Sequence, residues 1–239
     1  MQNITDKVAL ITGGSKGIGL GIAEILLEAG LKVAVTSRSA EVAQTTADQL
    51  NTKYPGKALG IASDVRDLAA EQKAVEQVVA HFGQLDVLVA NAGLGHFAPI
   101  QDLTPEQWQS IIDTNLTGVF HSVKAAIPAL KDTEGYIITI ASLAGTNFFP
   151  TASAYNASKF GLVGFTQAIM LDLRHEGIKV STIMPGSVAT EFNNHNPSDA
   201  DAWKIQPEDI GQMVADLLRM HPRTLPSKVE VRPSRPPKR

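Results

Sequence analysis

The chain has 239 residues, with 21 Lys and Arg against 24 Asp and Glu, no cysteine and a net charge of −3. Without cysteine it forms no disulfide framework, thiolate nucleophile or cysteine-based metal site. The nearly neutral charge argues against binding to a nucleic-acid backbone, and the few aromatic residues (8 Phe, 3 Tyr and 2 Trp) argue against stacking on single strands.

Membrane and export signals are not found in the sequence. No uninterrupted apolar run approaches the roughly 18–20 residues that a membrane span needs, and the N-terminus lacks a signal-peptide pattern. We therefore expect a cytoplasmic protein with no membrane partner. The length suits one hydrophobic core, so we predict a single domain over residues 1–232. Residues 233–239 are basic and rich in proline, which favours a flexible, solvated tail.

Short apolar segments alternate with longer amphipathic segments along the chain. Predicted strands occupy residues 7–12, 32–36, 58–62, 85–90, 135–140, 178–184 and 228–231. Predicted helices occupy residues 17–29, 40–53, 67–82, 104–130, 152–176 and 207–220. The strands are apolar nearly throughout, which is typical of parallel strands covered on both faces. The pattern predicts an α/β fold with a doubly wound parallel sheet flanked by helices.

Ligands of such sheets bind beyond the carboxyl ends of the strands. Polar or glycine residues follow nearly every predicted strand there: Thr12-Gly13, Ser37-Arg38, Ser63-Asp64, Asn91-Ala92-Gly93, Ala141-Ser142 and Pro185-Gly186. Because loops also contain these residue types for turn chemistry alone, each position is weighed separately.

The turn after the first predicted strand contains Gly13, Gly17 and Gly19, and a predicted helix begins near Gly17. Glycines let a phosphate approach the backbone, where free N–H groups and the helix dipole favour negative charge. The glycine spacing differs from the G-x-G-x-x-G motif of the commoner dinucleotide-binding fold. The turn also lacks the Gly-Lys-Ser/Thr sequence that ends a nucleoside-triphosphate-binding P-loop. Tight packing is the alternative explanation, but the position between strand and helix favours a phosphate cradle.

The second predicted strand ends at Ser37 and Arg38, and no acidic residue follows until Glu41. An NAD site usually has a carboxylate near this point to bind the ribose hydroxyls. An arginine and a small hydroxyl instead suit a 2′-phosphate, and Lys16 adds a second positive charge. Two solvated surface cations are the alternative. We therefore expect NADP(H) as the cofactor rather than NAD(H).

Tyr155 and Lys159 share one face of a predicted helix, since they are spaced i, i+4. A free tyrosine has a pKa of about 10, and a nearby ammonium favours tyrosinate and so lowers that pKa. The phenol would then suit general acid–base work near neutral pH. By itself this short motif also fits an ordinary amphipathic helix.

Ser142 lies at the end of the fifth predicted strand. Its hydroxyl would polarise a substrate carbonyl whose oxygen exchanges a proton with Tyr155. A nucleophilic role would need a base, and the sequence around Ser142 lacks the nucleophile-elbow pattern. A local turn in which the hydroxyl caps the strand end is the other alternative.

Together these residues resemble the short-chain dehydrogenase/reductase family over about residues 5–232. The matching motifs occur in the family's order: Thr12-Gly13, Gly17, Gly19, Asp64, Asn91-Ala92-Gly93, Asn115, Ser142, Tyr155, Lys159 and Pro185-Gly186. The resemblance implies a Rossmann-type sheet of seven parallel strands in the order 3-2-1-4-5-6-7. One mild departure is Ala90, where the family has a first asparagine before Asn91.

The resemblance assigns the chemistry to four residues. Tyr155 would be the catalytic acid/base, and Lys159 would lower its pKa and bind the nicotinamide ribose. Ser142 would orient the substrate carbonyl. Asn115 would hold a water that links Lys159 to solvent as a proton relay.

The resemblance also implies a cofactor site built from several loops. The glycine turn would bind the pyrophosphate, and the end of the second strand would bind the 2′-phosphate. Later loops would bind the adenosine, and the segment that begins at Pro185 would bind the nicotinamide. The residues are Gly13, Ser15, Lys16, Gly17, Ile18, Gly19, Ser37, Arg38, Asp64, Val65, Asn91, Ala92, Gly93, Tyr155, Lys159, Pro185, Gly186, Val188 and Thr190.

The substrate is harder to predict than the reaction. The segment between Thr190 and Pro207, the family's variable lid, is short and suggests an open pocket. Besides Ser142 and Tyr155, the predicted substrate-binding residues are Leu94, His96, Phe149 and Phe192, and further candidate walls are Phe97, Phe148 and Trp203. A solvent-facing loop position is the alternative for His96. The histidines show no metal-ligand spacing, so no metal site is expected.

These observations favour an NADPH-dependent reductase that converts a ketone or aldehyde to an alcohol, reversibly. The sequence is similar to 3-oxoacyl-(acyl-carrier-protein) reductases, and its C-terminal segment resembles sepiapterin-reductase-like members. The resemblance implies that the substrate would be a 3-oxoacyl thioester or a small carbonyl compound. A pterin or diketone reductase, a dehydratase or epimerase, and a non-enzymatic NADP(H)-binding sensor are the alternatives. By resemblance, the helices at 104–130 and 152–176 would pair between subunits in a homodimer or homotetramer.

Overall fold

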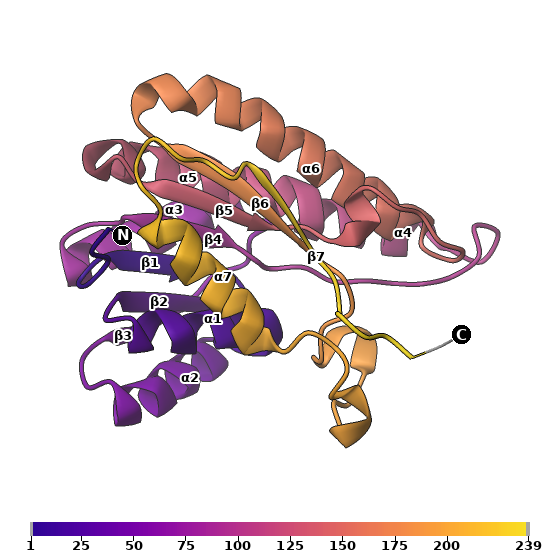
Figure 1. Cartoon of the computed structure of the whole chain (residues 1–239). Helices are drawn as coiled ribbons and strands as arrows, with labels where there is room; N and C mark the ends of the chain where they lie inside the picture. The colour runs from indigo at the N-terminus through magenta and orange to yellow at the C-terminus, as the bar shows by residue number, and fades with distance from the viewer. Residues whose placement is uncertain (1, 238–239) are drawn as a thin grey trace.

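Seven parallel strands form one sheet in the order β3-β2-β1-β4-β5-β6-β7, which confirms the predicted fold class (Figure 1). The structure, a computed structural model, describes residues 2–237. The strands are β1 (Val8–Ile11), β2 (Lys32–Ser37), β3 (Ala58–Ala62), β4 (Val87–Ala90), β5 (Tyr136–Ile140), β6 (Lys179–Pro185) and β7 (Lys228–Val231). The strand order reverses at β1, which has β2 on one side and β4 on the other. Such a switch point opens a crevice at the carboxyl ends of the strands.

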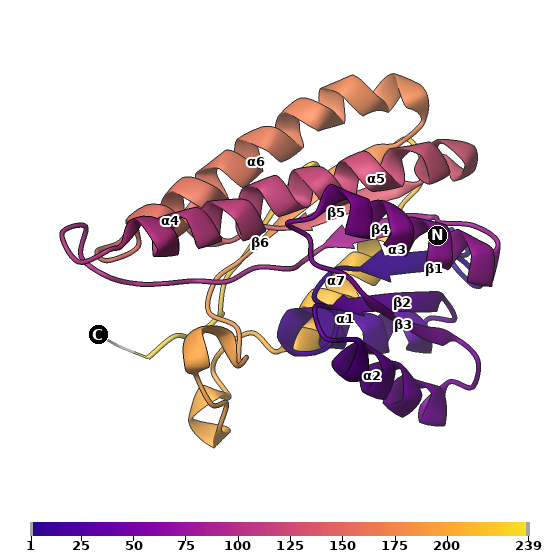
Figure 2. The same ribbon diagram turned by 180° about the vertical axis from the view of Figure 1, so that it is seen from behind.

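Helices cover both faces of the sheet (Figures 1 and 2). They are α1 (Gly17–Glu28), α2 (Ala40–Lys53), α3 (Leu68–Phe82), α4 (Pro105–Ile112), α5 (Gly118–Thr133), α6 (Ser153–Leu173) and α7 (Pro207–Arg219). Residues of α1, α2 and α7 belong to the apolar cluster on one face, and residues of α3, α5 and α6 to the cluster on the other.

The two-sided covering explains why the strands are apolar throughout. In β1, Ala9 and Ile11 pack into one cluster, whereas Val8 and Leu10 pack into the other. Successive side chains of a strand point to opposite faces, so a strand between two helix layers needs apolar residues at every position.

The predicted helix at 104–130 is interrupted by a π-helical turn. Helix α4 begins with the Thr104 cap and Pro105 at its first position, and its capping box is completed by Gln107. The turn Asp113–Thr117 then inserts an extra residue before α5. Single π turns inside helices are often found at functional sites, and this one contains Asn115.

The chain after β7 is only partly described. Residues 234–237 are exposed, whereas Pro233 lies against Gly186. Lys238 and Arg239 of the predicted tail lie outside the described residues. Within residues 2–237, no helix is both long enough and apolar enough to span a membrane.

Candidate active site

A cleft with a volume of about 560 Å³ lies at the carboxyl ends of β1 to β6. The sheet topology brings the loops after these strands together there, although they are far apart in the sequence. Most of the predicted site residues line it: Gly13, Ser15, Lys16, Gly17, Ile18, Ser37, Arg38, Asp64, Val65, Asn91, Ala92, Gly93, Leu94, His96, Tyr155, Lys159, Pro185, Gly186, Val188, Thr190 and Phe192.

Four predicted site residues are not part of the lining: Gly19, Asn115, Ser142 and Phe149. Gly19 is a packing residue, because a Cβ there would lie closer than 3.0 Å to the side chain of Asn91. Asn115 is fully buried, and Ser142 and Phe149 belong to the segment between β5 and α6.

The glycine turn after β1 has the backbone that an anion site needs. Gly13 and Gly17 have φ angles of 62° and 53°, in the left-handed region that favours glycine. A Cβ on Gly13 would also press against the backbone of Ala92 at 3.0 Å. Helix α1 begins at Gly17 without a side-chain cap, so its first N–H groups have no cap to bind and stay available to an anion.

Asn91 and Thr12 hold this turn against the end of β4. The Asn91 side-chain amide donates to the carbonyl oxygens of Thr12 and Gly13 at 3.0 and 3.1 Å. In return, the Thr12 hydroxyl accepts from the backbone N–H groups of Asn91 and Ala92. The turn is therefore rigid before any ligand binds.

Positive charge gathers in the part of the cleft formed after β1, β2 and β3. Lys16 and the exposed Arg38 line it, as predicted, and Arg66 adds a third cation. Arg66 pairs with Asp64, with Nη2 2.6 Å from Oδ2, and its hydrogen bonds lower the pKa of the Asp64 carboxyl although burial opposes this. Three cations thus face two carboxylates, Asp64 and Glu191, the second of which lies near Gly17. Sequence reasoning missed Arg66, which stands two residues after the predicted Asp64.

Lys159 lies one turn after Tyr155 on α6, and its side chain is buried. Its Nζ donates to the carbonyl oxygen of Ile140 at 3.0 Å and lies 5.8 Å from the centre of the Tyr155 ring. Burial lowers the pKa of Lys159 to about 8, since removal from water disfavours the ammonium form.

The pKa of Tyr155 is raised, opposite to the direction expected from the lysine. Burial of the phenol is the larger cause, and a hydrogen bond with Ser142 opposes it. The pKa rises because burial disfavours phenolate, and because burial also removes part of the Lys159 charge in the pH range where phenolate would form. Of the two neighbours, Ser142 is the one whose hydrogen bond favours phenolate.

The Ser142 hydroxyl makes both of the interactions considered from the sequence, the local turn and the contact with Tyr155. Its hydroxyl accepts from the backbone N–H of Ala144 at 3.1 Å, which is the local turn, and it also bonds to Tyr155. The loop that begins there is held by Asn156, whose amide donates to the carbonyls of Ala144 and Asn147 at 2.7 Å each. Sequence reasoning missed Asn156, because its partners are known only once the loop is folded.

Asn115 is fully buried, and its side-chain amide forms hydrogen bonds with other residues of the protein. Oδ1 accepts from the backbone N–H of Leu94 at 2.9 Å, and Nδ2 donates to the Leu94 carbonyl at 2.9 Å and to the Ser158 hydroxyl at 3.1 Å. Ser158 in turn donates to the carbonyl of Tyr155 at 2.8 Å. Asn115 therefore connects the loop after β4 to the helix turn that carries Tyr155.

Aromatic side chains surround Tyr155 at the other end of the cleft. The rings of Phe97 and Phe192 lie 5.4 and 5.7 Å from it, centre to centre, and Phe149 lies 6.0 Å from Phe97. Two of the candidate walls lie elsewhere. Phe148 is 86% exposed, and Trp203 lines a separate surface hollow.

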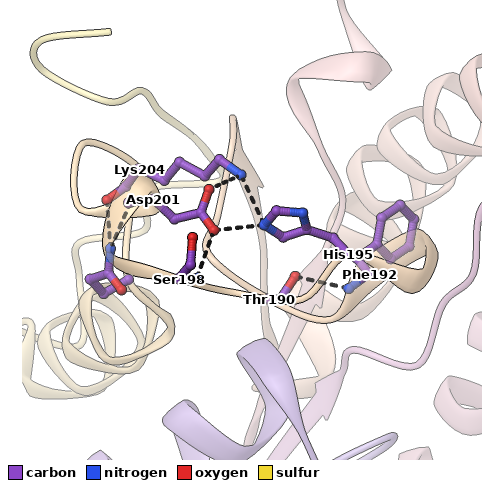
Figure 3. A network of polar contacts seen from close by, with 7 residues as sticks. Thr190, Phe192, His195, Ser198, Asp201 and Lys204 are labelled. Atoms are coloured by element: carbon purple, nitrogen blue, oxygen red, sulfur yellow. Dashed lines mark hydrogen bonds and ion pairs between the residues drawn. The ribbon is translucent and has the colours of Figure 1, made fainter. Parts of the chain in front are cut away.

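The segment between Thr190 and Pro207 is braced by a polar network (Figure 3). The Asp201 carboxylate contacts Lys204 Nζ at 2.5 Å and His195 Nε2 at 2.6 Å, and it accepts from the backbone N–H of Ser198. Hydrogen bonds from Lys204 and His195 lower the pKa of Asp201. The braced segment carries Phe192 at the cleft, next to Thr190.

Among residues 2–237, no group of three or more His, Asp or Glu side chains has an arrangement that would hold a metal ion.

Known proteins with similar sequences are oxidoreductases. The family model described as short chain dehydrogenase matches residues 7–201. An uncharacterized oxidoreductase of Staphylococcus aureus (strain MW2) is 33% identical over 98% of this chain and 100% of its own length. The 3-oxoacyl-(acyl-carrier-protein) reductase FabG of Escherichia coli (strain K12) is 37% identical over 89% of this chain and 86% of its own length.

Solved structures agree with the sequence comparisons. An alcohol dehydrogenase from the archaeon Thermococcus sibiricus, complexed with 5-hydroxy-NADP, superposes with a TM-score of 0.90 at 27% identity, over 98% of this chain and 99% of that one. A 3-ketoacyl-(acyl-carrier-protein) reductase from Brucella melitensis, complexed with NADH, has a TM-score of 0.87 at 27% identity, over 96% and 98%. The chain belongs to the short-chain dehydrogenase/reductase family of oxidoreductases.

Proposed function

We propose that the protein is an NADP(H)-dependent reductase that interconverts a ketone or aldehyde and the corresponding alcohol. The observation that carries the proposal is the joint placement of Tyr155, Ser142 and Lys159 beside a turn suited to an anion. The cleft fits a nicotinamide dinucleotide, because Gly13 and Gly17 leave the backbone bare where a pyrophosphate would approach. When bound, this cofactor supplies or accepts the hydride.

The protein's part of the reaction is to hold the carbonyl and to move a proton. The Tyr155 hydroxyl would donate its proton to the carbonyl oxygen during reduction and would take it back in the reverse reaction. Ser142 donates a second hydrogen bond to that oxygen. In its protonated form Lys159 would stabilise the phenolate that remains and would hold the nicotinamide ribose, and Asn115 keeps this end of the cleft in place.

Charge supports the choice of NADP(H) over NAD(H). The two solved relatives were complexed with an NADP derivative and with NADH, so relatives alone leave this choice open. In this chain Lys16 and Arg38 line the cleft with Ser37, and no carboxylate stands at the end of β2. A 2′-phosphate would gain charge-assisted hydrogen bonds there, whereas the free ribose hydroxyls of NAD(H) would lack their usual acceptor.

The catalytic proposal is tested with Tyr155→Phe, which removes the hydroxyl and keeps the ring. Oxidation of NADPH with a carbonyl screen of acetoacetyl thioesters, diketones, pterins and simple ketones should fall by at least about 100-fold, a loss typical of a missing general acid. Tyr54→Phe, at the end of α2, is the control and should leave the rate unchanged. Near-wild-type turnover of a folded Tyr155→Phe protein would sink the proposal, and NADPH binding without turnover in the wild type would favour a sensor.

The cofactor proposal is tested with Arg38→Asp. We expect kcat/KM with NADPH to fall by about 10- to 100-fold, the value of one charged hydrogen bond, with little loss for NADH. Arg174→Asp, at the far end of α6, controls for net charge. A wild-type preference for NADH would contradict the charge argument.

We also propose that the protein acts in the cytoplasm as a homodimer or homotetramer. Exposed apolar side chains on the outer helices support self-association: Trp108 of α4, Phe120 of α5, and Phe160 and Leu171 of α6. Helices α5 and α6 lie side by side there (Figure 2), and the rings of Phe120 and Phe165 meet at 6.4 Å. Sedimentation velocity should show one oligomer that Phe120→Glu dissociates; a monomeric wild type would contradict the proposal.

A further inference from the structure

Three phenylalanines from three different loops form a cluster that contacts Tyr155 through Phe97 and Phe192. Phe97 follows β4, Phe149 follows β5 and Phe192 follows β6, and these strands are neighbours in the sheet. Phe97 lies between the other rings, with its centre 5.4 Å from Tyr155, 6.0 Å from Phe149 and 6.3 Å from Phe192. The sheet topology alone brings these rings to the group that would donate the proton.

Two of these rings are partly exposed to solvent and are therefore not part of the hydrophobic core. Phe149 is 47% exposed and Phe192 is 38% exposed, and Phe192 lines the cleft itself. Apolar area of this size is unfavourable in contact with water. Free energy is gained when a ligand covers it and removes it from water. Phe192 thus offers a free face to a molecule held at the Tyr155 hydroxyl, and Phe149, beyond Phe97, offers exposed apolar area to a group that extends out of the cleft.

Gly95 permits the close approach of two of these rings. A Cβ at this position would lie 2.8 Å from Cζ of Phe192 and 3.1 Å from Cε2 of Phe97. Its φ angle is not positive, so the glycine is explained by space and not by backbone conformation. The absence of a side chain at Gly95 therefore shapes the aromatic wall, and Gly95 also lines the cleft.

Charge is placed at the opposite end of the cleft. Among the lining residues that the structure describes, Lys16, Arg38 and Arg66 come from the loops after β1, β2 and β3. The cation at the aromatic end is Lys159, whose ammonium is buried and bonded to the carbonyl of Ile140. A substrate carboxylate or phosphate near Tyr155 would find little charge to pair with, so a neutral substrate fits better.

We propose that the site selects neutral carbonyl compounds with an aryl group attached close to the carbonyl. This inference rests on the proposed reductase function. With the carbonyl oxygen at Tyr155 and Ser142, the aryl ring packs against Phe192 and Phe149. Aromatic pairs in edge-to-face or offset geometry gain free energy beyond their buried area, which for two rings amounts to roughly a tenfold preference in kcat/KM over a saturated ring.

The test compares acetophenone with cyclohexyl methyl ketone, which has the same skeleton with a saturated ring. Because the two ketones differ in intrinsic reactivity, the measured quantity is the change of their kcat/KM ratio between variants. Phe192→Leu and Phe149→Leu keep apolar bulk but remove a ring, and each should lower the ratio by about threefold, and the double variant by about tenfold. Phe148→Leu is the matched control, since its side chain is 86% exposed and belongs to no described ring pair.

A ratio that stays the same in Phe192→Leu and Phe149→Leu, or that falls equally in Phe148→Leu, would overturn the inference. A wild type that reduces 4-acetylbenzoate as well as acetophenone would overturn the part about charge. If the wild type oxidises no NADPH with any carbonyl, the reductase proposal itself fails. Calorimetric binding of 1-phenylethanol and 1-cyclohexylethanol, with NADP⁺ present, then still tests the aromatic wall: tighter binding of the phenyl alcohol supports it, and equal binding refutes it.

Discussion

Replacing Asn115 by alanine should destabilise the protein more than any other change at the candidate site. The fully buried side chain makes three hydrogen bonds, two with the backbone of Leu94 and one with Ser158. A typical hydrogen bond contributes about 1 kcal/mol, and partners left buried without water cost more. The loss should therefore be roughly 2–4 kcal/mol, a large share of the 5–15 kcal/mol typical of a whole domain.

The assay is thermal and urea unfolding followed by circular dichroism, together with NADPH oxidation well below the melting temperature. For a chain of this size, about 1 kcal/mol shifts Tm by roughly 2–4 °C, so Tm should fall by roughly 4–16 °C. Ser158→Ala removes only one of the three bonds of Asn115, and its Tm should fall less. Activity should drop as well, because the bonds of Asn115 position both the Leu94 loop and the turn that carries Tyr155.

An Asn115→Ala protein with unchanged stability would refute this reasoning. If kcat nevertheless collapsed in such a protein, the proton-relay role implied by the family resemblance would remain and the structural role would be lost. If stability and kcat both fell and Ser158→Ala showed the same pattern to a smaller degree, the hydrogen-bonded connection between Leu94 and α6 would be confirmed.

Three further measurements test the packing and the charges. Burial raises the pKa of Glu71 above its usual 4.5, so the folded protein keeps a proton that the unfolded chain loses. The free energy of unfolding should therefore fall as pH rises from the unfolded pKa of this group to its raised folded pKa. Glu71→Gln should abolish this pH dependence in urea titrations. The Lys159 ammonium, with a pKa of about 8, loses its charge as pH rises, so kcat/KM for NADPH should decline above about pH 8; a flat profile to pH 10 would contradict this. Gly60→Ala would place a Cβ closer than 3.0 Å to the carbonyl oxygen of Ala43, costing about 1–3 kcal/mol, whereas Gly164→Ala, with open space, should cost nothing; equal melting temperatures would refute the close approach.

The family resemblance and the residues together predicted the fold closely, because local signals agreed with one another. The apolar segments and the glycine turn near Gly17 both act within a few residues of the chain. The strand order came from the family resemblance and was confirmed. The π turn at Asp113–Thr117 was not predicted, because the bonds that Asn115 gains with Leu94 and Ser158 are tertiary and compensate for the less regular helix there.

The sequence by itself determined the residue types that the chemistry needs: the glycine turn, the cations near Ser37, and Tyr155 with Lys159 one helical turn later. These follow from spacing along the chain, which does not change on folding. Tertiary structure decided the rest, since desolvation and long-range contacts exist only in the folded chain. Burial reversed the expected pKa shift of Tyr155, and the meeting of β4, β5 and β6 turned phenylalanines scattered between positions 97 and 192 into one aromatic wall.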